Sequence, residues 1–288
     1  MSSSPLLRYK SVDPEARCSL PIGRFTTPHA MSSLLGGLLL MGGVYGLALF
    51  VRDWKMSGVT VWEYLTGFSG FPIVMMFLSC WSASILIIKA LKIRAQRLAL
   101  TVHIVPDDPK FTVTASTAQR IVQTIGAAVE DPRKFMYFNR IIVAMRSMRN
   151  VGRVGDIDEM LQSAAANDES VVESGYTLLK GFVWSIPVLG FIGTVVGLTQ
   201  TMGSFKVVLD EAKNANNDPK IIINGLSGVL GGLDTAFITT GEALLLVFFI
   251  HMVSVFVRSA DEALLDDARE GAHENIAGRV RIEPESRA

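Results

Sequence analysis

The sequence predicts an all-α membrane protein with four transmembrane helices, helical cytoplasmic extensions, and a cytoplasmic helical domain between the second and third spans. Three observations support this fold class: an apolar composition, four long apolar stretches, and charged segments with helical periodicity between them. The 288 residues are 49% hydrophobic and 19% charged, with a mean hydropathy of +0.37. Such values are typical of a membrane protein. The net charge of zero gives no sign of nucleic-acid binding.

The four stretches each meet the length of roughly 20 apolar residues that a bilayer requires. The expected transmembrane helices are residues 31–51, 71–91, 181–205 and 226–257. The first span contains five glycines, a composition that favours close packing of helices: Gly36, Gly37, Gly42, Gly43 and Gly46. Trp54 and Trp62 lie between the first two spans, where aromatic side chains anchor a protein at the membrane interface.

The distribution of basic residues predicts the orientation of the chain. Only five of the 27 Lys and Arg residues lie in the segments 52–70 and 206–225. By the positive-inside rule these two are short periplasmic loops, and segments 1–30, 92–180 and 258–288 are cytoplasmic. No removable signal peptide is expected, because no short apolar core with a cleavage site precedes the first span. Two cysteines form no disulfide framework and are expected as free thiols.

Segment 92–180 shows the apolar periodicity of packed helices. Pro132 suits the first position of a helix, and Asp156 and Asp168 suit N-terminal caps. The first expected helix runs from Ser116 or Thr117 to about Val129. The second runs from Pro132 to Arg149 and is ended by Gly152 and Gly155. A short helix over Ile157–Ala166 follows, and the last helix runs from Asp168 into the third span. The fourth span is expected to continue beyond Arg258 as a charged helix to about Ala272, followed by a tail.

The third span, residues 181–205, contains no charged residue and is not a simple lipid anchor. A series of small and polar residues recurs at spacings of three and four and forms one helical stripe: Pro187, Gly190, Thr194, Gly197 and Thr201. Gly193 and Gly197 add a GxxxG pair, which lets another helix approach closely. The span is therefore interpreted as a helix packed against other helices around something polar.

The fourth span contains several polar groups that are costly in hydrocarbon: Asp234, Thr235, Thr239, Thr240 and Glu242. Thr235, Thr239 and Glu242 share a helical face, whereas Thr240 lies about 100° from Thr239. This arrangement predicts two polar faces, one toward a neighbouring subunit and one toward a central pore. Thr194 and Thr240 are expected at comparable depth, because the third span runs outward and the fourth runs inward.

Each of these groups also has a purely structural interpretation. A threonine within a membrane often bonds only the carbonyl four residues earlier. Glu242 is either an acid that holds helices together or a group on the ion path, and the second role is favoured because buried intramembrane carboxyl groups are commonly functional. Asp234 is interpreted as an interfacial cap, His251 as a packed or lipid-interface residue, and Pro187 as a kink or part of the stripe.

The last two spans resemble the MotA/TolQ/ExbB family of ion-driven motor subunits. The run PVLGFIGTVVGLTQTMGSF, Pro187–Phe205, is similar to the family's Pro-x-x-Gly-x-x-Gly-Thr-Val-x-Gly pattern. The run LDTAFITTGEAL, which begins at Leu233, is similar to the family's last span with its internal threonine. On this resemblance Thr194 matches the threonine of the Gly-Thr-Val run and Thr240 that of the last span, with Thr239 as the alternative.

The resemblance implies a pentameric ring of such subunits around a dimer of a single-span partner of the MotB, TolR or ExbD type. The partner carries an intramembrane Asp, and flow of protons or sodium ions drives rotation or force in a bacterial inner membrane, with both termini cytoplasmic. No cofactor is implied beyond the transported ion. The expected ion-path residues are Thr194, Thr240, Thr239, Glu242 and Thr201, and the expected packing and kink residues are Pro187, Gly190, Gly193 and Gly197.

The features of the subfamilies are mixed in this chain. Four spans resemble MotA, whereas Gly193-Thr194 resembles TolQ and ExbB. Asp234 and Glu242 lie outside the family pattern and leave ion selectivity and gating open. The rotor-contacting charges of MotA have no recognisable counterpart in Lys92–Lys180, so nothing supports a flagellar role.

The sequence also bears on three other functions. A membrane enzyme is disfavoured, because the sequence contains no HExxH, GxSxG, P-loop or Cys/His cluster. A sensor receptor would carry a sizeable outer domain, and both outer loops are short. A passive oligomeric ion channel or membrane scaffold without a partner remains the alternative to the motor subunit.

Overall fold

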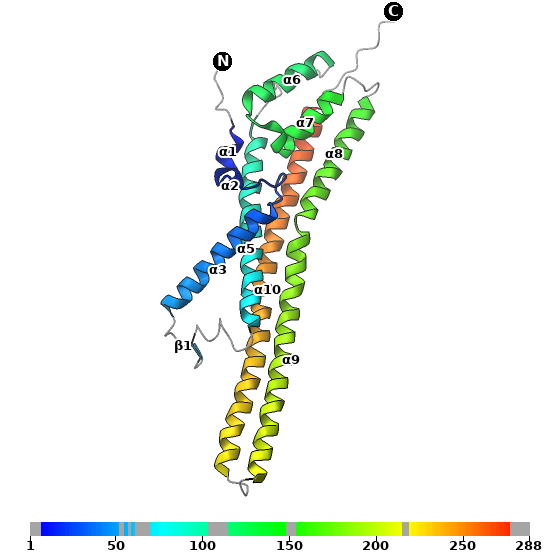
Figure 1. The fold of residues 1–288 in the computed structure, drawn as a ribbon. Coiled ribbons are helices and arrows are strands. Elements are labelled where there is room, and N and C mark those ends of the chain that lie inside the picture. The colour runs from blue at the N-terminus through cyan, green and yellow to red at the C-terminus, as the bar shows by residue number, and fades with distance from the viewer. Residues whose placement is uncertain are drawn as a thin grey trace, which may run out of the picture. The chain divides into compact units, whose positions relative to one another are not determined.

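The computed structural model describes residues 7–51, 55–56, 59–60, 70–102, 115–147, 154–214 and 219–276, which are largely helical (Figure 1). The expected interfacial Trp54 and Trp62 lie outside these residues. The helices are α1 (Tyr9–Val12), α2 (Pro14–Arg17), α3 (Ala30–Phe50), α5 (Phe71–Leu100), α6 (Ala115–Ala128), the 3-10 helix η1 (Pro132–Lys134), α7 (Met136–Ser147), α8 (Val154–Ser174), α9 (Thr177–Asn214) and α10 (Pro219–Asn275).

Four helical stretches are long and apolar enough to cross a membrane, which confirms the expected number of spans. They lie at Ala30–Phe50, Phe71–Leu100, Asp158–Glu211 and Leu226–Asn275. The charged extension of the fourth span is also confirmed, because α10 continues to Asn275. The chain is therefore a multi-pass helical membrane protein.

Both expected outer loops contain more regular structure than the sequence indicated. In segment 52–70, strands β1 (Lys55–Met56) and β2 (Val59–Thr60) pair antiparallel. Within the segment 206–225, α9 extends to Asn214 and α10 begins at Pro219, so much of this expected loop is helical. The charges after Phe205 suggested a loop, but charge does not end a helix. Pro219 fits the first turn of α10, where its missing N–H costs no hydrogen bond.

The expected cap at Asp168 is also wrong, since α8 passes through this residue without a break. The Asp168 carboxylate is buried and accepts hydrogen bonds from Arg140 Nε at 3.3 Å and Nη2 at 3.0 Å. The helix ends instead at Gly175, where a Cβ atom would lie 2.8 Å from Thr27 Oγ1. That hydroxyl donates to the Val171 carbonyl, so only glycine leaves room for it.

Two smaller boundaries differ as well. Gly155 lies inside α8 rather than ending the preceding helix. Pro132 opens the short η1 turn, and α7 begins only at Met136.

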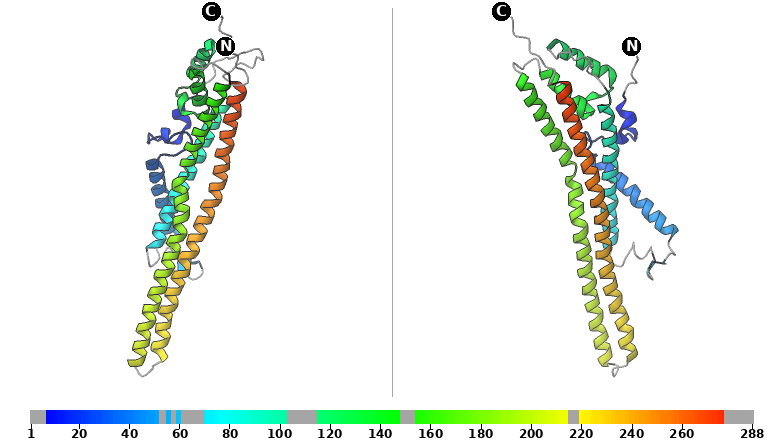
Figure 2. Two further views of the ribbon diagram at one scale, coloured as in Figure 1. Left: turned by 90° about the vertical axis from the view of Figure 1, so that its right-hand side faces the viewer. Right: turned by 180° about the vertical axis from the view of Figure 1, so that it is seen from behind.

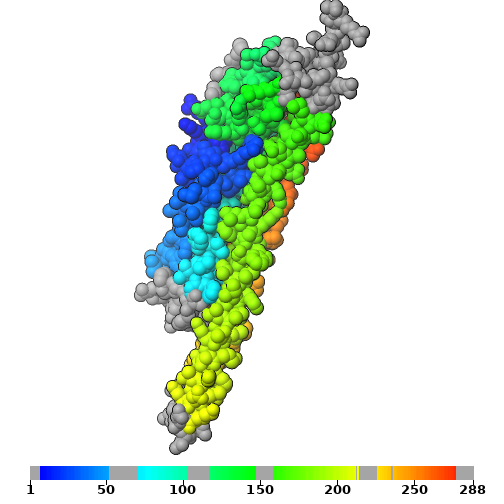
Figure 3. All heavy atoms as spheres, turned by 45° about the vertical axis from the view of Figure 1, so that its right-hand side comes forward, coloured from blue at the N-terminus to red at the C-terminus, as the bar shows by residue number. Residues whose placement is uncertain are grey.

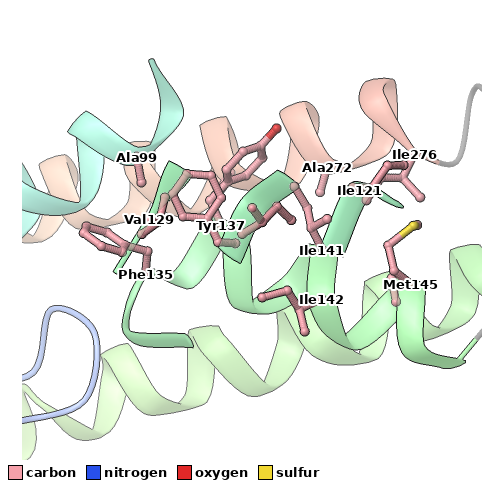
Figure 4. Close-up of a cluster of buried hydrophobic side chains, with 14 of the residues drawn as sticks. Ala99, Ile121, Val129, Phe135, Tyr137, Ile141, Ile142, Met145, Ala272 and Ile276 are labelled. Carbon is pink, nitrogen blue, oxygen red and sulfur yellow. The ribbon is translucent and has the colours of Figure 1, made fainter. Parts of the chain in front are cut away.

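The chain forms two compact units, of which the first comprises residues 1–33, 86–177 and 255–288. Its core joins α6 and α7 to the ends of α5 and α10, and Figure 4 shows Tyr137 and Ile141 beside Ala272. The apolar face predicted for α7 is confirmed, because its four members are buried: Phe135, Phe138, Ile142 and Met145.

The N-terminal segment of this unit is fastened to α5 by a buried charge pair. Glu15 lies 2.5 Å from Lys92 Nζ and accepts hydrogen bonds from the backbone N–H groups of Gly23 and His29, both at 2.8 Å, and from the Ser32 hydroxyl. Burial alone raises the pKa of the Glu15 carboxyl, but the hydrogen bonds outweigh burial and hold its pKa below the ordinary value of 4.5.

The second unit comprises residues 34–85 and 178–254, in which α9 and α10 lie side by side (Figure 2). The α3 helix packs on α5 through Gly37, where a Cβ atom would lie 2.8 Å from the Trp81 Cα. The Trp81 ring in turn lies 4.9 Å from the Phe182 ring of α9. Much of α9 lies open on the face shown in Figure 3. Large apolar side chains of this helix, such as Trp184, are exposed as they would be to lipid.

Replacing Glu15 by Gln should destabilise the protein, because the change leaves Lys92 as a buried charge without its closest counterion. We expect a loss of about 3 kcal/mol, the size typical of breaking a buried pair. The thermal unfolding midpoint in one detergent measures this effect, and Glu169→Gln, at an exposed acid of α8, is the matched control. Equal midpoints for the two variants would contradict the assignment.

The same pair predicts a pH dependence. A carboxyl group whose pKa is lowered in the folded state stabilises the fold above its unfolded pKa, and this stabilisation is lost as the pH falls through the folded value. The stability difference between the wild type and Glu15→Gln should therefore be constant near neutrality and shrink below about pH 4.5. Unfolding midpoints between pH 7 and pH 3 test this expectation, and a difference that grows on acidification contradicts it.

Candidate functional site

The small-residue stripe of α9 is the surface that contacts α10 of the same chain. A Cβ atom at Gly197 would lie 2.9 Å from the Ala236 Cβ, and one at Gly193 would lie 3.0 Å from Thr239 Oγ1. Gly190 meets Ala243 in the same way. The glycines of one helix thus face the small side chains of the other, and the two backbones approach closely. We call this contact the α9–α10 seam.

The first and last residues of the stripe, Pro187 and Thr201, both have structural roles within the chain. Thr201 is buried, packs against Gly232 of α10 and donates to its own Gly197 carbonyl at 2.9 Å. Pro187 lies inside α9, which continues through it. These residues support the seam, and neither brings a group that carries charge.

Thr194 of α9 and Thr240 of α10 form a hydroxyl pair in the middle of the seam. The two Oγ1 atoms are hydrogen-bonded to each other, as the expected matched depth requires. Thr194 Oγ1 also lies 3.0 Å from the Ala236 carbonyl oxygen, and both hydroxyls lie 3.2 Å from the Gly190 carbonyl oxygen. Four oxygens from two helices therefore converge at one point, and both threonine side chains are half-buried.

The chemistry of this cluster is that of a neutral oxygen site. Two hydroxyl groups contribute two hydrogens, each of which has more than one acceptor within reach, so the hydroxyls can reorient. Hard cations bind such oxygens, but usually with carboxylates that balance the charge. In the described part of the chain no group of His, Cys, Asp and Glu residues has the arrangement of a metal site. The cluster could therefore assist an ion or proton only if another group brought the negative charge.

Thr239 is not part of the hydroxyl pair. Its hydroxyl is buried and donates to the Ala236 carbonyl at 3.0 Å, and its side chain fills the space beside Gly193. This matches the structural interpretation of a membrane threonine that bonds within its own helix. Geometry therefore favours Thr240 over Thr239 as the partner of Thr194.

The structure places Glu242 away from the hydroxyl pair. Glu242 follows Thr240 by two residues, about 200° around the helix. It is 4% exposed, and neither carboxyl oxygen has a hydrogen-bond partner among the described residues. Tyr45 of α3 is the described side chain that lies near enough to both Glu242 and Cys80 of α5 for an electrostatic interaction. Of the other polar groups in the fourth span, Asp234 and His251 are exposed.

Sequence reasoning missed a buried triad in the first unit. Lys89 Nζ lies 2.7 Å from Asp261 Oδ2 and 3.9 Å from the centre of the Tyr176 ring, and the Tyr176 hydroxyl donates to the same Oδ2 at 3.1 Å. The Asp261 carboxylate therefore binds both the Lys89 ammonium group and the Tyr176 phenol through one oxygen.

One signal in the sequence could have revealed Asp261. It occupies the same helical stripe as four buried apolar residues of α10, at spacings of three and four: Val257, Leu264, Ala268 and Ala272. An acid on an apolar stripe predicts burial with a partner. No local pattern, however, identifies Lys89 as that partner.

The fold and the seam define the class of protein: a multi-pass helical membrane protein whose last two spans pack through small residues around a hydroxyl pair. Residues 138–269 match the model of the MotA/TolQ/ExbB proton channel family. The resemblance seen in the last two spans is confirmed, and the match extends it back into α7. Comparisons with curated proteins and with solved structures gave no match.

The seam predicts that substitution by alanine has different effects on stability at two glycines of α9. Gly197→Ala should destabilise the protein by about 1–3 kcal/mol, because the new methyl group collides with the Cβ atom of Ala236. Gly203→Ala should be neutral or stabilising by about 0.5–1 kcal/mol, since a Cβ atom there has nothing within 4 Å. Thermal unfolding midpoints of the two variants give the comparison, and equal losses would show that the helices do not pack through Gly197.

Proposed function

We propose that this protein is the A-type subunit of an ion-driven membrane motor. In this proposal a pentameric ring of identical chains surrounds a dimer of a single-span partner and couples proton or sodium flow to rotation or force. The observation that supports it is the Thr194–Thr240 hydroxyl pair, which lies at the centre of the α9–α10 seam and inside the family domain. Membership of a family of proton channels supports an ion-channel type of function and gives no support to an enzyme.

The charge that the cluster lacks has a natural source in the partner. A carboxylate that faces the hydroxyls would receive hydrogen bonds from them, and hydrogen bonds to charged groups are the strong ones. Once protonated, the carboxyl group would be neutral and would pass an apolar surface at a much lower cost. The transmembrane potential supplies about 2.3 kcal/mol per charge per 100 mV to drive this cycle.

The exposed surface of the two last helices is consistent with an assembly in a bilayer. Several large apolar side chains of α9 and α10 are more than half exposed, and these must face lipid or neighbouring copies: Trp184, Phe191, Met202, Phe237, Phe248 and Phe256. The distribution of basic residues supports cytoplasmic termini in a bacterial inner membrane.

A passive oligomeric ion channel or membrane scaffold is the second candidate, and one observation favours it. The two hydroxyls already bond to each other and lie within reach of the carbonyls of Gly190 and Ala236, so the pair is satisfied without a partner. The neighbouring reading frames discriminate the two candidates. A short protein with one N-terminal span that bears an Asp favours the motor, and the absence of such a protein favours the passive function.

The proposed role of the hydroxyls is tested by Thr194→Val and Thr240→Val, which keep the side-chain shape and remove the oxygen. Each should lower ion uptake at least about tenfold in vesicles that contain the chain and its partner, since a hydrogen bond to a charged group contributes roughly 1.5–3 kcal/mol. Ring assembly, followed by size-exclusion chromatography, should not change.

Two control variants accompany this measurement. Thr199→Val removes an exposed hydroxyl of α9 that donates to the Val195 carbonyl, and it should conduct normally. Thr194→Ser keeps the oxygen and should retain most of the flux. Normal uptake by both valine variants of the pair would refute the proposed ion path.

A further inference from the structure

We propose that Glu242 is a separate proton-binding site on the side of α10 toward Tyr45, and that it is the carboxyl group of this chain that hydrophobic carbodiimides modify. Its contribution to ion flow rests on the proposed function, whereas its chemical reactivity does not. The site would take a proton in the membrane and, experimentally, an uncharged carbodiimide.

The first argument is that no described residue forms a hydrogen bond with this buried carboxyl group. Both oxygens are buried and have no hydrogen-bond partner among the described residues. The side chain is 4% exposed, so water does not solvate the two oxygens either. An ionised carboxylate without a partner costs several kcal/mol in such surroundings, and the neutral acid costs far less. The site therefore holds the proton.

The second argument separates Glu242 from a residue that merely holds helices together. Such a residue forms a hydrogen bond across the helix interface. Glu242 forms none, and its sequence neighbour Ala243 and the nearby Thr239 already supply the packing against α9. An unpaired acid in a packed helix destabilises the fold, so its presence is better explained by proton binding than by packing.

The third argument comes from the neighbouring helix. Tyr45 of α3 lies near enough to Glu242 for an electrostatic interaction, and it stands between Gly43 and Gly46. A Cβ atom at either glycine would have nothing within 4 Å, so these two positions of α3 border open space. A small shift of α3 would change the distance between the phenol and the acid, and thus the cost of ionising Glu242.

The modification reaction requires the protonated acid and a dry site. Glu242 transfers its proton to a carbodiimide nitrogen, and the carboxylate oxygen then adds to the central carbon of the carbodiimide. The adduct, an O-acylisourea, rearranges to a stable N-acylurea when water is excluded. Every atom of both reactants is retained, and nothing is oxidised or reduced.

The experiment treats the full chain in lipid vesicles with dicyclohexylcarbodiimide and maps adducts by peptide mass spectrometry. We expect at least tenfold more adduct at Glu242 than at the exposed Asp234 of the same helix. Glu242→Gln should lose the adduct, and Asp234→Asn should leave it unchanged. A water-soluble carbodiimide should show the opposite preference.

The proposal is overturned if Glu242 remains unlabelled by the hydrophobic reagent, or if the water-soluble reagent labels it as well as Asp234. Labelling needs neither partner nor ion gradient, so it can succeed even if the threonine variants refute the proposed motor. In vesicles that conduct ions, Glu242→Gln should change uptake at least threefold. Unchanged uptake would overturn the link between this acid and ion flow and would leave the hydroxyl pair unaffected.

Discussion

The close approach of α9 and α10 is the constraint on which the membrane part of this protein depends. Glycines at positions 190, 193 and 197 leave no space for a side chain, so the two helices approach closely in the observed register. That register brings Thr194 to Thr240 and turns Glu242 to the other side of α10. The oxygen cluster is thus a consequence of packing, because without the glycines the hydroxyls would be too far apart to bond.

A different interaction orders the unit that carries α6, α7 and α8. Three buried pairs join distant parts of the chain: Lys92 with Glu15, Lys89 with Asp261, and Arg140 with Asp168. Buried ion pairs add little net stability, because desolvation offsets their attraction. Their effect is on specificity, since any other arrangement of these helices would leave a charge buried without its partner. Each pair therefore selects one packing of the elements that it joins.

Sequence reasoning identified what depends on local spacing and missed what depends on distant partners. The four spans, the stripe of α9 and the apolar face of α7 follow from helical periodicity, and the structure contains them. Asp168 was misread as a cap because its partner Arg140 lies on another helix. The burial of Glu15 does not follow from the sequence for the same reason, since its partner Lys92 is far along the chain. Periodicity placed Thr240 and Glu242 on different faces, but only tertiary structure shows which helix each face meets.

The buried pairs also constrain the topology of the chain in the bilayer. Glu15 precedes α3 and Lys92 lies near the end of α5, so two crossings separate the partners of one ion pair. Two further crossings separate Lys89 from Asp261. Groups in direct contact must lie at the same level relative to the bilayer, and an even number of crossings returns the chain to the same level. With one span more or fewer between these partners the ion pairs could not form in the same way, so they are tied to the number of spans.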